Sequence, residues 1–240
     1  DHRDLHSFPT RRSSDLPVYL GRIRGYDSMM IGETMFVSGA AMFLTAPVAG
    51  ALSSKLDPRI MMMVGFAGFA AGTYTMTYMT ADWDFYELLV PQILRGCSLM
   101  LCMVPINNIA LGTLPPDRIK NASGLFNLTR NLGGAVGLAV INTMLTQRSD
   151  EHYARLSEHA DWGNRAALDW LASVGANYDS YGLDGTAVAM QKLSGVITQQ
   201  SWLLSFIDVF MGLTLLFLSL IFLVFLIKKP SAPAPAGAGH

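Results

Sequence analysis

The stretch that most constrains this chain is VFMGLTLLFLSLIFLVFLI at residues 209–227, which contains no charged residue and no side-chain amide. A helix of roughly 20 apolar residues is long enough to cross the hydrocarbon core of a bilayer. Residues 60–81 form a second uncharged stretch, and the whole chain is 51% hydrophobic and only 15% charged. The pattern predicts an all-α membrane protein that crosses the bilayer several times.

Five membrane spans are predicted, at residues 29–53, 60–80, 86–114, 122–146 and 203–227. The third and fourth spans contain Arg95 and Arg130. A guanidinium group facing lipid at the depth of the hydrocarbon core is costly. Both arginines are therefore expected to face the interior of a helix bundle.

The charges of the short connections predict the orientation. Loops 53–59 and 115–121 and the tail after the fifth span are basic, whereas loop 81–85 is acidic. Basic loops stay preferentially in the cytoplasm. The first span is therefore expected to run from outside to inside, and the C-terminus is expected to be cytoplasmic. The basic residues concerned are Lys55, Arg59, Arg118, Lys120, Lys228 and Lys229.

Residues 147–202 are predicted to form an extracytoplasmic helical hairpin. Ser149, followed by two acidic residues, is expected to begin its first helix, and residues 186–199 to form the second. His152 and His159 lie seven residues apart on one helix face, which is expected to be solvated because a metal site needs more ligands. Residues 228–240 are rich in Pro, Ala and Gly and are predicted to be a disordered cytoplasmic tail.

Residues 1–16, DHRDLHSFPTRRSSDL, fit neither a signal peptide nor a membrane span. They back-translate, codon for codon, to a common high-throughput sequencing adapter. We interpret them as non-native and exclude them from the fold. The chain from Pro17 onward is then expected to be the C-terminal part of a longer membrane protein.

The remaining sequence resembles the major facilitator superfamily, and within it the fourteen-span drug:proton antiporters of the EmrB and QacA type. The resemblance rests on LPVYLGRIRGY, GALSSKLDPR, QQSWLLSFIDVF and PQILRGCSLMLCMVPINNIALGTLPPDRIKNASGLFNLTRNLGGAVGLAV. It implies that the five helices are spans ten to fourteen, from the C-terminal half of the bundle. GALSSKLDPR matches the family's cytoplasmic loop motif only in part, through Gly50, Leu52, Lys55 and Arg59; Ser54 replaces an acidic residue and Asp57 a glycine.

Several polar residues within or near the spans are candidates for function. Arg130 is either a substrate-contacting or switch residue, or else a structural pair or an anchor to the interface. Arg95, Asn107, Asn108 and Asn127 are further candidates for lining a substrate cavity. Glu33 and Asp208 are candidates for proton coupling, with ordinary interfacial carboxylates as the alternative. The resemblance places the main coupling carboxylates in the other half of the family's fold.

Four glycines, Gly124, Gly133, Gly134 and Gly137, give the fourth span a surface of small residues. The GxxxG spacing of Gly133 and Gly137 favours close helix packing, and a smooth helix also suits sliding during alternating access. The sequence contains no enzyme or nucleotide-binding motif. No cofactor, metal, nucleic-acid partner or enzymatic activity is therefore predicted.

Two functions remain open at this stage. The first is a fragment of a proton-coupled multidrug efflux transporter that exports hydrophobic or cationic compounds by alternating access and confers antibiotic resistance. Its expected surroundings are the bacterial inner membrane, protons, small-molecule drugs and a periplasmic membrane-fusion adaptor protein as a candidate partner. The alternative is a non-transporting membrane subunit or scaffold that binds a partner through its external loop.

Overall fold

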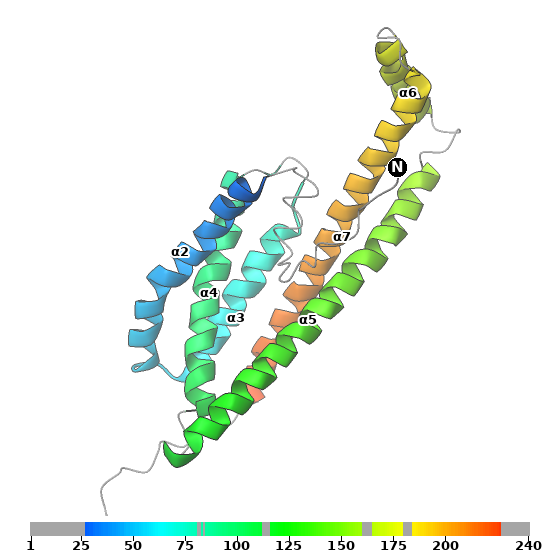
Figure 1. The fold of residues 1–240 in the computed structure, drawn as a ribbon. Helices are drawn as coiled ribbons and strands as arrows, with labels where there is room; N and C mark the ends of the chain where they lie inside the picture. Colours follow the sequence, from blue (N-terminus) through cyan, green and yellow to red (C-terminus); the bar gives the residue numbers. More distant parts are fainter. Residues whose placement is uncertain are drawn as a thin grey trace, which may run out of the picture.

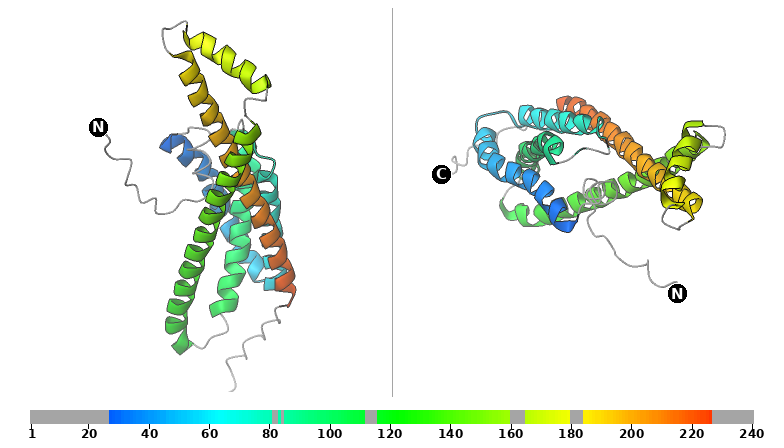
Figure 2. Two further views of the ribbon diagram at one scale, coloured as in Figure 1. Left: turned by 90° about the vertical axis from the view of Figure 1, so that its right-hand side faces the viewer. Right: turned by 90° about the horizontal axis from the view of Figure 1, so that it is seen from above.

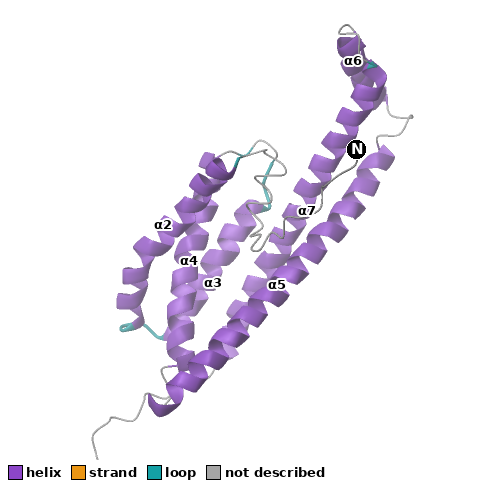
Figure 3. Ribbon diagram, viewed as in Figure 1, coloured by secondary structure: helices purple, strands orange, loops and turns teal. Residues whose placement is uncertain are grey.

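The computed structural model describes residues 27–80, 83, 85–111, 116–159, 165–179 and 184–226. Within these residues every regular element is an α-helix (Figure 3). Both expected end segments, 1–16 and 228–240, lie outside the described residues. The helices are α2 (Ser28–Ser53), α3 (Pro58–Met76), α4 (Phe85–Leu111), α5 (Pro116–His159), α6 (Arg165–Asp179) and α7 (Gly185–Leu226).

Aspartate side chains begin the first two of these helices. Asp27 accepts hydrogen bonds from the backbone N–H groups of Met29 and Met30 at 3.0 and 2.9 Å. Asp57 accepts one from the N–H of Arg59 at 3.2 Å, and Pro58 occupies the first turn of α3. A carboxylate at this position satisfies backbone donors that have no partner inside the helix. Asp57, which departs from the family's loop motif, thus acts as the N-cap of α3.

The helices pack in a definite order. Helix α4 packs against both α2 and α3, α3 packs against α7, and α7 also packs against α5 and α6 (Figures 1 and 2). Helices α4 and α5 make little contact. The buried core joins α3, α4, α5 and α7 near one end of the bundle, through Met76, Met79, Leu88, Leu145, Leu203, Phe206, Val209 and Phe210.

Within the part of the chain that the structure describes, three helices are long and apolar enough to cross a membrane: α2, the segment Phe85–Ala110 of α4, and α7. The other two predicted spans lie on α3, which has 19 residues, and on the first part of α5, which has 44. Neither is among the three helices that satisfy length and apolar composition together. The count of five spans therefore stays a prediction from the sequence.

Two predicted helix ends are wrong. Ser149 does not begin a helix but lies buried inside α5, which continues unbroken to His159. No glycine or proline occurs between Gly137 and His159, so nothing in the sequence stops the helix. Likewise, residues 186–199 are not separate from the last span, because α7 runs without a break from Gly185 to Leu226. The hairpin that the structure shows consists of α6 folded back on the start of α7.

Facing residues fix the shift of each helix along its neighbour. In the antiparallel pair of α3 and α7, the Thr214 hydroxyl donates a hydrogen bond to that of Thr73 at 2.9 Å. In an antiparallel pair the numbers of any two facing residues have the same sum, which is about 287 here. In the pair of α5 and α7, Met144 lies at Gly212 and His152 at Asp208, so facing numbers add to about 358.

This register shows which residues of α3, α5 and α7 lie at the same height along the bundle axis. Since all helices rise equally per residue, the charge-free residues 209–226 of α7 lie beside about residues 61–78 of α3. That range agrees with the predicted second span. On α5 the same level falls at about residues 132–149, rather than at the predicted 122–146. Where the fourth span lies along α5 stays a prediction.

Candidate functional site

Four ionisable side chains meet where α5 and α7 pack together. The His152 Nε2 atom lies 2.9 Å from Asp208 Oδ2, although the two residues are 56 positions apart. The Arg148 Nε atom lies 3.6 Å from the same carboxylate oxygen, and Arg148 Nη1 donates to Glu151 Oε2 at 2.9 Å. We call Arg148, Glu151, His152 and Asp208 the α5–α7 ionic cluster.

Two features bring the cluster together: the spacing of its residues on α5, and the axial position of α7 beside α5. Arg148, Glu151 and His152 stand three and four residues apart, so they share one face of α5. Asp208 lies just outside the charge-free run of α7, two residues after the buried Phe206. The cluster therefore sits at the edge of the membrane level, at the end that the loop charges predict to be external.

The members of the cluster differ in exposure. The His152 side chain is 18% exposed, that of Asp208 is 37% exposed, and the outer pair of Arg148 and Glu151 is about half exposed. The prediction that His152 lies on a solvated face is therefore wrong. Sequence reasoning singled out Asp208 but missed its two partners on α5, because it began a separate external helix at Ser149 where α5 continues.

Glu33, the other proton-coupling candidate, is in a different place. It is exposed on α2 and lines an open hollow of about 540 Å³ with Gly32, Phe36, Val37 and Phe85. The structure therefore does not join Glu33 with the α5–α7 ionic cluster.

A second polar location lies inside the bundle, between α2, α3 and α4. Arg95 is half-buried and lines a cavity of about 210 Å³ together with Gln92, Ser38, Met42 and other residues. Gln92 is almost fully buried and donates a hydrogen bond to the Thr34 carbonyl oxygen at 3.4 Å. Sequence reasoning missed Gln92, although an amide one turn before Arg95 in an apolar helix was a visible indication.

The remaining substrate candidates are not brought together. Arg130, Asn127 and Asn108 are exposed, and Asn107 is half-buried. The expectation that Arg130 faces the interior of a bundle is thus not met in this chain, because α4 hardly contacts α5 and leaves this face uncovered. By the register of α5 and α7, Arg130 also lies just beyond the inner end of the membrane level.

The predicted glycine packing is not seen either. A Cβ atom added at Gly124, Gly133, Gly134 or Gly137 would meet no atom within 4 Å. The close helix contacts lie elsewhere, at Gly65 and Gly68 against α4 and at Gly96 against α2. Gly68 forms a GxxxG spacing with Gly72, which also lies close to α4, whereas Gly65 and Gly96 belong to no such spacing. The sequence analysis singled out the glycines of another span, so the packing of α2, α3 and α4 identifies these.

The loop motif before α3 has one unusual feature. The Nε and Nη2 atoms of Arg59 are buried and have no hydrogen-bond partner among the described residues. Lys55 is exposed, and a Cβ added at Gly50 would meet nothing within 4 Å.

Among the described residues, no group of three or more His, Cys, Asp or Glu side chains is placed to hold a metal ion.

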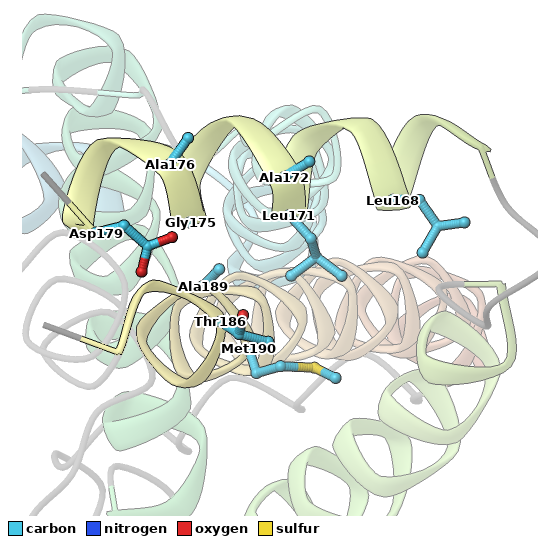
Figure 4. A pocket seen from close by; sticks show the side chains of 9 residues that line it. All are labelled: Leu168, Leu171, Ala172, Gly175, Ala176, Asp179, Thr186, Ala189 and Met190. Atoms are coloured by element: carbon cyan, nitrogen blue, oxygen red, sulfur yellow. The ribbon is translucent and has the colours of Figure 1, made fainter.

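The hairpin of α6 and α7 contains a groove of about 270 Å³ (Figure 4). Leu171 and Ala172 of α6 and Ala189 and Met190 of α7 are among its mostly apolar lining residues. The Asp179 carboxylate at one end accepts a hydrogen bond from the N–H of Gly185 at 2.8 Å. Close contact between Gly175 and Gly185 allows the two helices to meet there.

We expect Gly185→Ala to open this hairpin. The new Cβ would lie 2.6 Å from Asp179 Oδ1 and also against the Gly175 carbonyl, so the turn must shift. Overpacking of this kind costs about 1–3 kcal/mol. Limited trypsin digestion should cleave near Lys192 at least about fivefold faster than in the unchanged protein. Gly195→Ala is the matched control, since a Cβ there meets nothing within 4 Å; equal cleavage of both variants would contradict the packing argument.

Taken together, the helices define a polytopic α-helical membrane protein with ionisable side chains gathered at one edge of its membrane level. The family model described as Major Facilitator Superfamily matches residues 13–138. The chain belongs to this superfamily, which is one of transporters and not of enzymes. The match begins four residues before Pro17, inside the stretch interpreted as an adapter.

Comparison with individual proteins agrees with this assignment. The chain is 32% identical to the colistin resistance protein EmrB of Acinetobacter baumannii over 89% of its length and 42% of the relative's. It is 30% identical to the multidrug export protein EmrB of Escherichia coli K12, with 93% and 43% covered. It is 28% identical to the fatty acid resistance protein FarB of Neisseria gonorrhoeae, with 94% and 43% covered. The chain thus spans about two fifths of the length of these relatives.

Proposed function

We propose that this chain is part of a proton-coupled exporter of hydrophobic or cationic compounds that works by alternating access. Relatives named for multidrug export, colistin resistance and fatty acid resistance support export of such compounds. The single structural observation that carries the proton coupling is the contact between Asp208 and His152 at the edge of the membrane level. Ionisable groups in such places often take part in proton transfer.

We assign different roles to the candidate residues according to where they lie in the bundle. Asp208 is an acceptor for a proton from the external side, and the half-buried Arg95 with Gln92 offers a cation and an amide along the bundle interior. Arg130 and Asn127 lie on the face of α5 that this chain leaves uncovered. We assign that face to contact with the remaining part of the protein, where Arg130 could hold a carboxylate in the planar, two-pronged way that lysine cannot reproduce.

The proposed setting is the bacterial inner membrane, with the C-terminus in the cytoplasm. The basic loops support this orientation. The hairpin of α6 and α7 extends past the end of α5 (Figure 1), at the end that is external in this orientation. A periplasmic membrane-fusion adaptor would contact the protein at this hairpin.

Transport by the whole protein tests the proposal. Inverted membrane vesicles should accumulate a lipophilic cationic dye when the interior is acidified, and a protonophore should abolish the accumulation. Asp208→Asn should reduce it at least about tenfold, the effect of losing about 1.4 kcal/mol. Asp184→Asn is the control, since Asp184 lies exposed just before α7. Accumulation that persists after the protonophore, or equal loss in both variants, would contradict proton coupling through Asp208.

A further inference from the structure

We propose that His152 and Asp208 form a proton-binding site shared by α5 and α7, in which the protonated imidazole clasps the external ends of the two helices together. The role of this site in transport rests on the proposed function, but the existence of the clasp does not. The ligand is a proton, and the binding groups are one imidazole nitrogen and one carboxylate oxygen.

The geometry suits a shared proton. The His152 Nε2 atom and Asp208 Oδ2 are 2.9 Å apart, which is the length of a hydrogen bond between a charged donor and a carboxylate. A protonated imidazole can donate from this nitrogen whichever tautomer the neutral ring adopts. The side chain of His152 is only 18% exposed, so water competes less for this contact than for the outer pair.

The cluster contains more negative than positive groups. With a neutral imidazole, the positive Arg148 and the negative Glu151 and Asp208 leave the cluster with a net charge of one negative unit. One proton on His152 neutralises it. Arg148 does not replace the imidazole, because its Nε atom is 3.6 Å from Asp208 while its Nη1 atom holds Glu151 at 2.9 Å.

Neighbouring elements present mainly apolar groups to this end of the α5–α7 pair. The core that contains Leu145 and Val209 also includes Met76 at the end of α3, Met79 in the segment after it, and Leu88 of α4. Helix α4 carries Glu87 beside Leu88. Two further charges lie on α5, the exposed Asp150 and, one turn beyond His152, Arg155, while Asp179 of α6 meets α7 only at its start.

The contact is placed to control how α5 and α7 meet. Away from the cluster, this interface is built from apolar side chains such as Ile141 and Met144 against Val209 and Leu213. This packing sets an axial position for the two helices, and a hydrogen-bonded ion pair adds a restraint that depends on the charge of the imidazole. Since histidine is the side chain whose charge ordinarily changes between about pH 5 and 8, external acidification would strengthen the clasp and alkalinisation would release it.

A double-mutant cycle in the whole protein tests the clasp without measuring transport. The unfolding equilibrium in SDS is measured for the unchanged protein, His152→Gln, Asp208→Asn and the double variant, at about pH 5.5 and pH 8. We expect the two substitutions to be coupled about three- to fivefold at the lower pH, as for a partly exposed ion pair. At the higher pH the coupling should be clearly weaker. Glu151→Gln with Asp208→Asn is the matched control and should show no such pH dependence.

The possible outcomes distinguish the His152–Asp208 contact from the proposed role of Asp208 in transport. Equal coupling at both pH values would mean that a neutral imidazole makes the bond, and absence of coupling would mean that the contact does not exist; either result overturns the clasp. If a variant does not fold, His152→Asn and Asp208→Glu replace it in the same cycle. Coupling that depends on pH, together with normal transport by Asp208→Asn, would support the clasp and overturn the proposed role of Asp208 in proton coupling.

Discussion

Replacing Gly96 by alanine should separate α2 from α4 and destabilise the bundle. An added Cβ at this position would lie 2.5 Å from the Ser38 carbonyl oxygen and 2.8 Å from the Ala41 Cβ. The obstacle is backbone of the facing helix, so a side-chain rotation cannot relieve it. The expected cost is about 1–3 kcal/mol from overpacking, reduced by up to about 1 kcal/mol because alanine favours helix.

Unfolding of the whole protein in SDS measures this loss. Gly39→Ala is the matched control, because Gly39 lies on α2 one residue after Ser38 and a Cβ there would meet nothing within 4 Å. The control should be as stable as the unchanged protein or slightly more stable. If Gly96→Ala were no less stable than Gly39→Ala, the close approach of α2 and α4 at Gly96 would be wrong.

Phe206→Ala should loosen the attachment of α7 to the bundle. Phe206 is completely buried at the centre of the core that joins α3, α4, α5 and α7, and its ring also contacts that of Trp202. In lipid, helices associate through close packing rather than through exclusion of water. Removal of a buried aromatic ring nevertheless forfeits many such contacts and leaves a cavity, which costs about 3–5 kcal/mol in well-packed cores.

Phe225→Ala provides the comparison on the same helix. The Phe225 side chain is 76% exposed and lies within the charge-free run of α7, where lipid would surround it. Its loss should change the unfolding free energy in SDS by less than about 0.5 kcal/mol. Equal losses for the two variants would show that α7 does not present Phe206 to the core, or that the Phe225 face is also covered in the whole protein.

Apolar runs predicted the helical content, and the resemblance of four sequence stretches to a known family predicted the superfamily; both are confirmed. Helix ends were predicted less well, since hydropathy marks where a helix leaves lipid and not where its hydrogen bonding stops. Helix α5 shows the difference: it passes from apolar to charged residues at about Gln147 and continues to His159. The error concealed the partners of Asp208, because residues assigned to a separate external hairpin cannot be paired with the last span by helical register.

Arg130 and the glycines of the fourth predicted span show a second limit. A charge or a small residue in an apolar helix indicates that a face needs a partner, but it does not say which helix supplies one. In this chain α4 packs on α2 and α3 through Gly96, Gly65 and Gly68, whereas the glycine face of α5 stays uncovered. The sequence therefore indicated helix faces that need a partner, but it did not show which of them pack together in this chain.

The sequence by itself determined that this chain forms apolar helices with basic connections, because hydropathy and charge are properties of local segments. It also determined that Asp208 stands at the edge of such a helix. Only the tertiary structure decided that His152 and Arg148 meet Asp208, that Gln92 lies buried beside the Arg95 cavity, and that Arg130 remains exposed. These relations depend on the axial shift between helices far apart in the chain. That shift is set by packing at residues such as Gly96, Thr214 and Phe206, which no local pattern records.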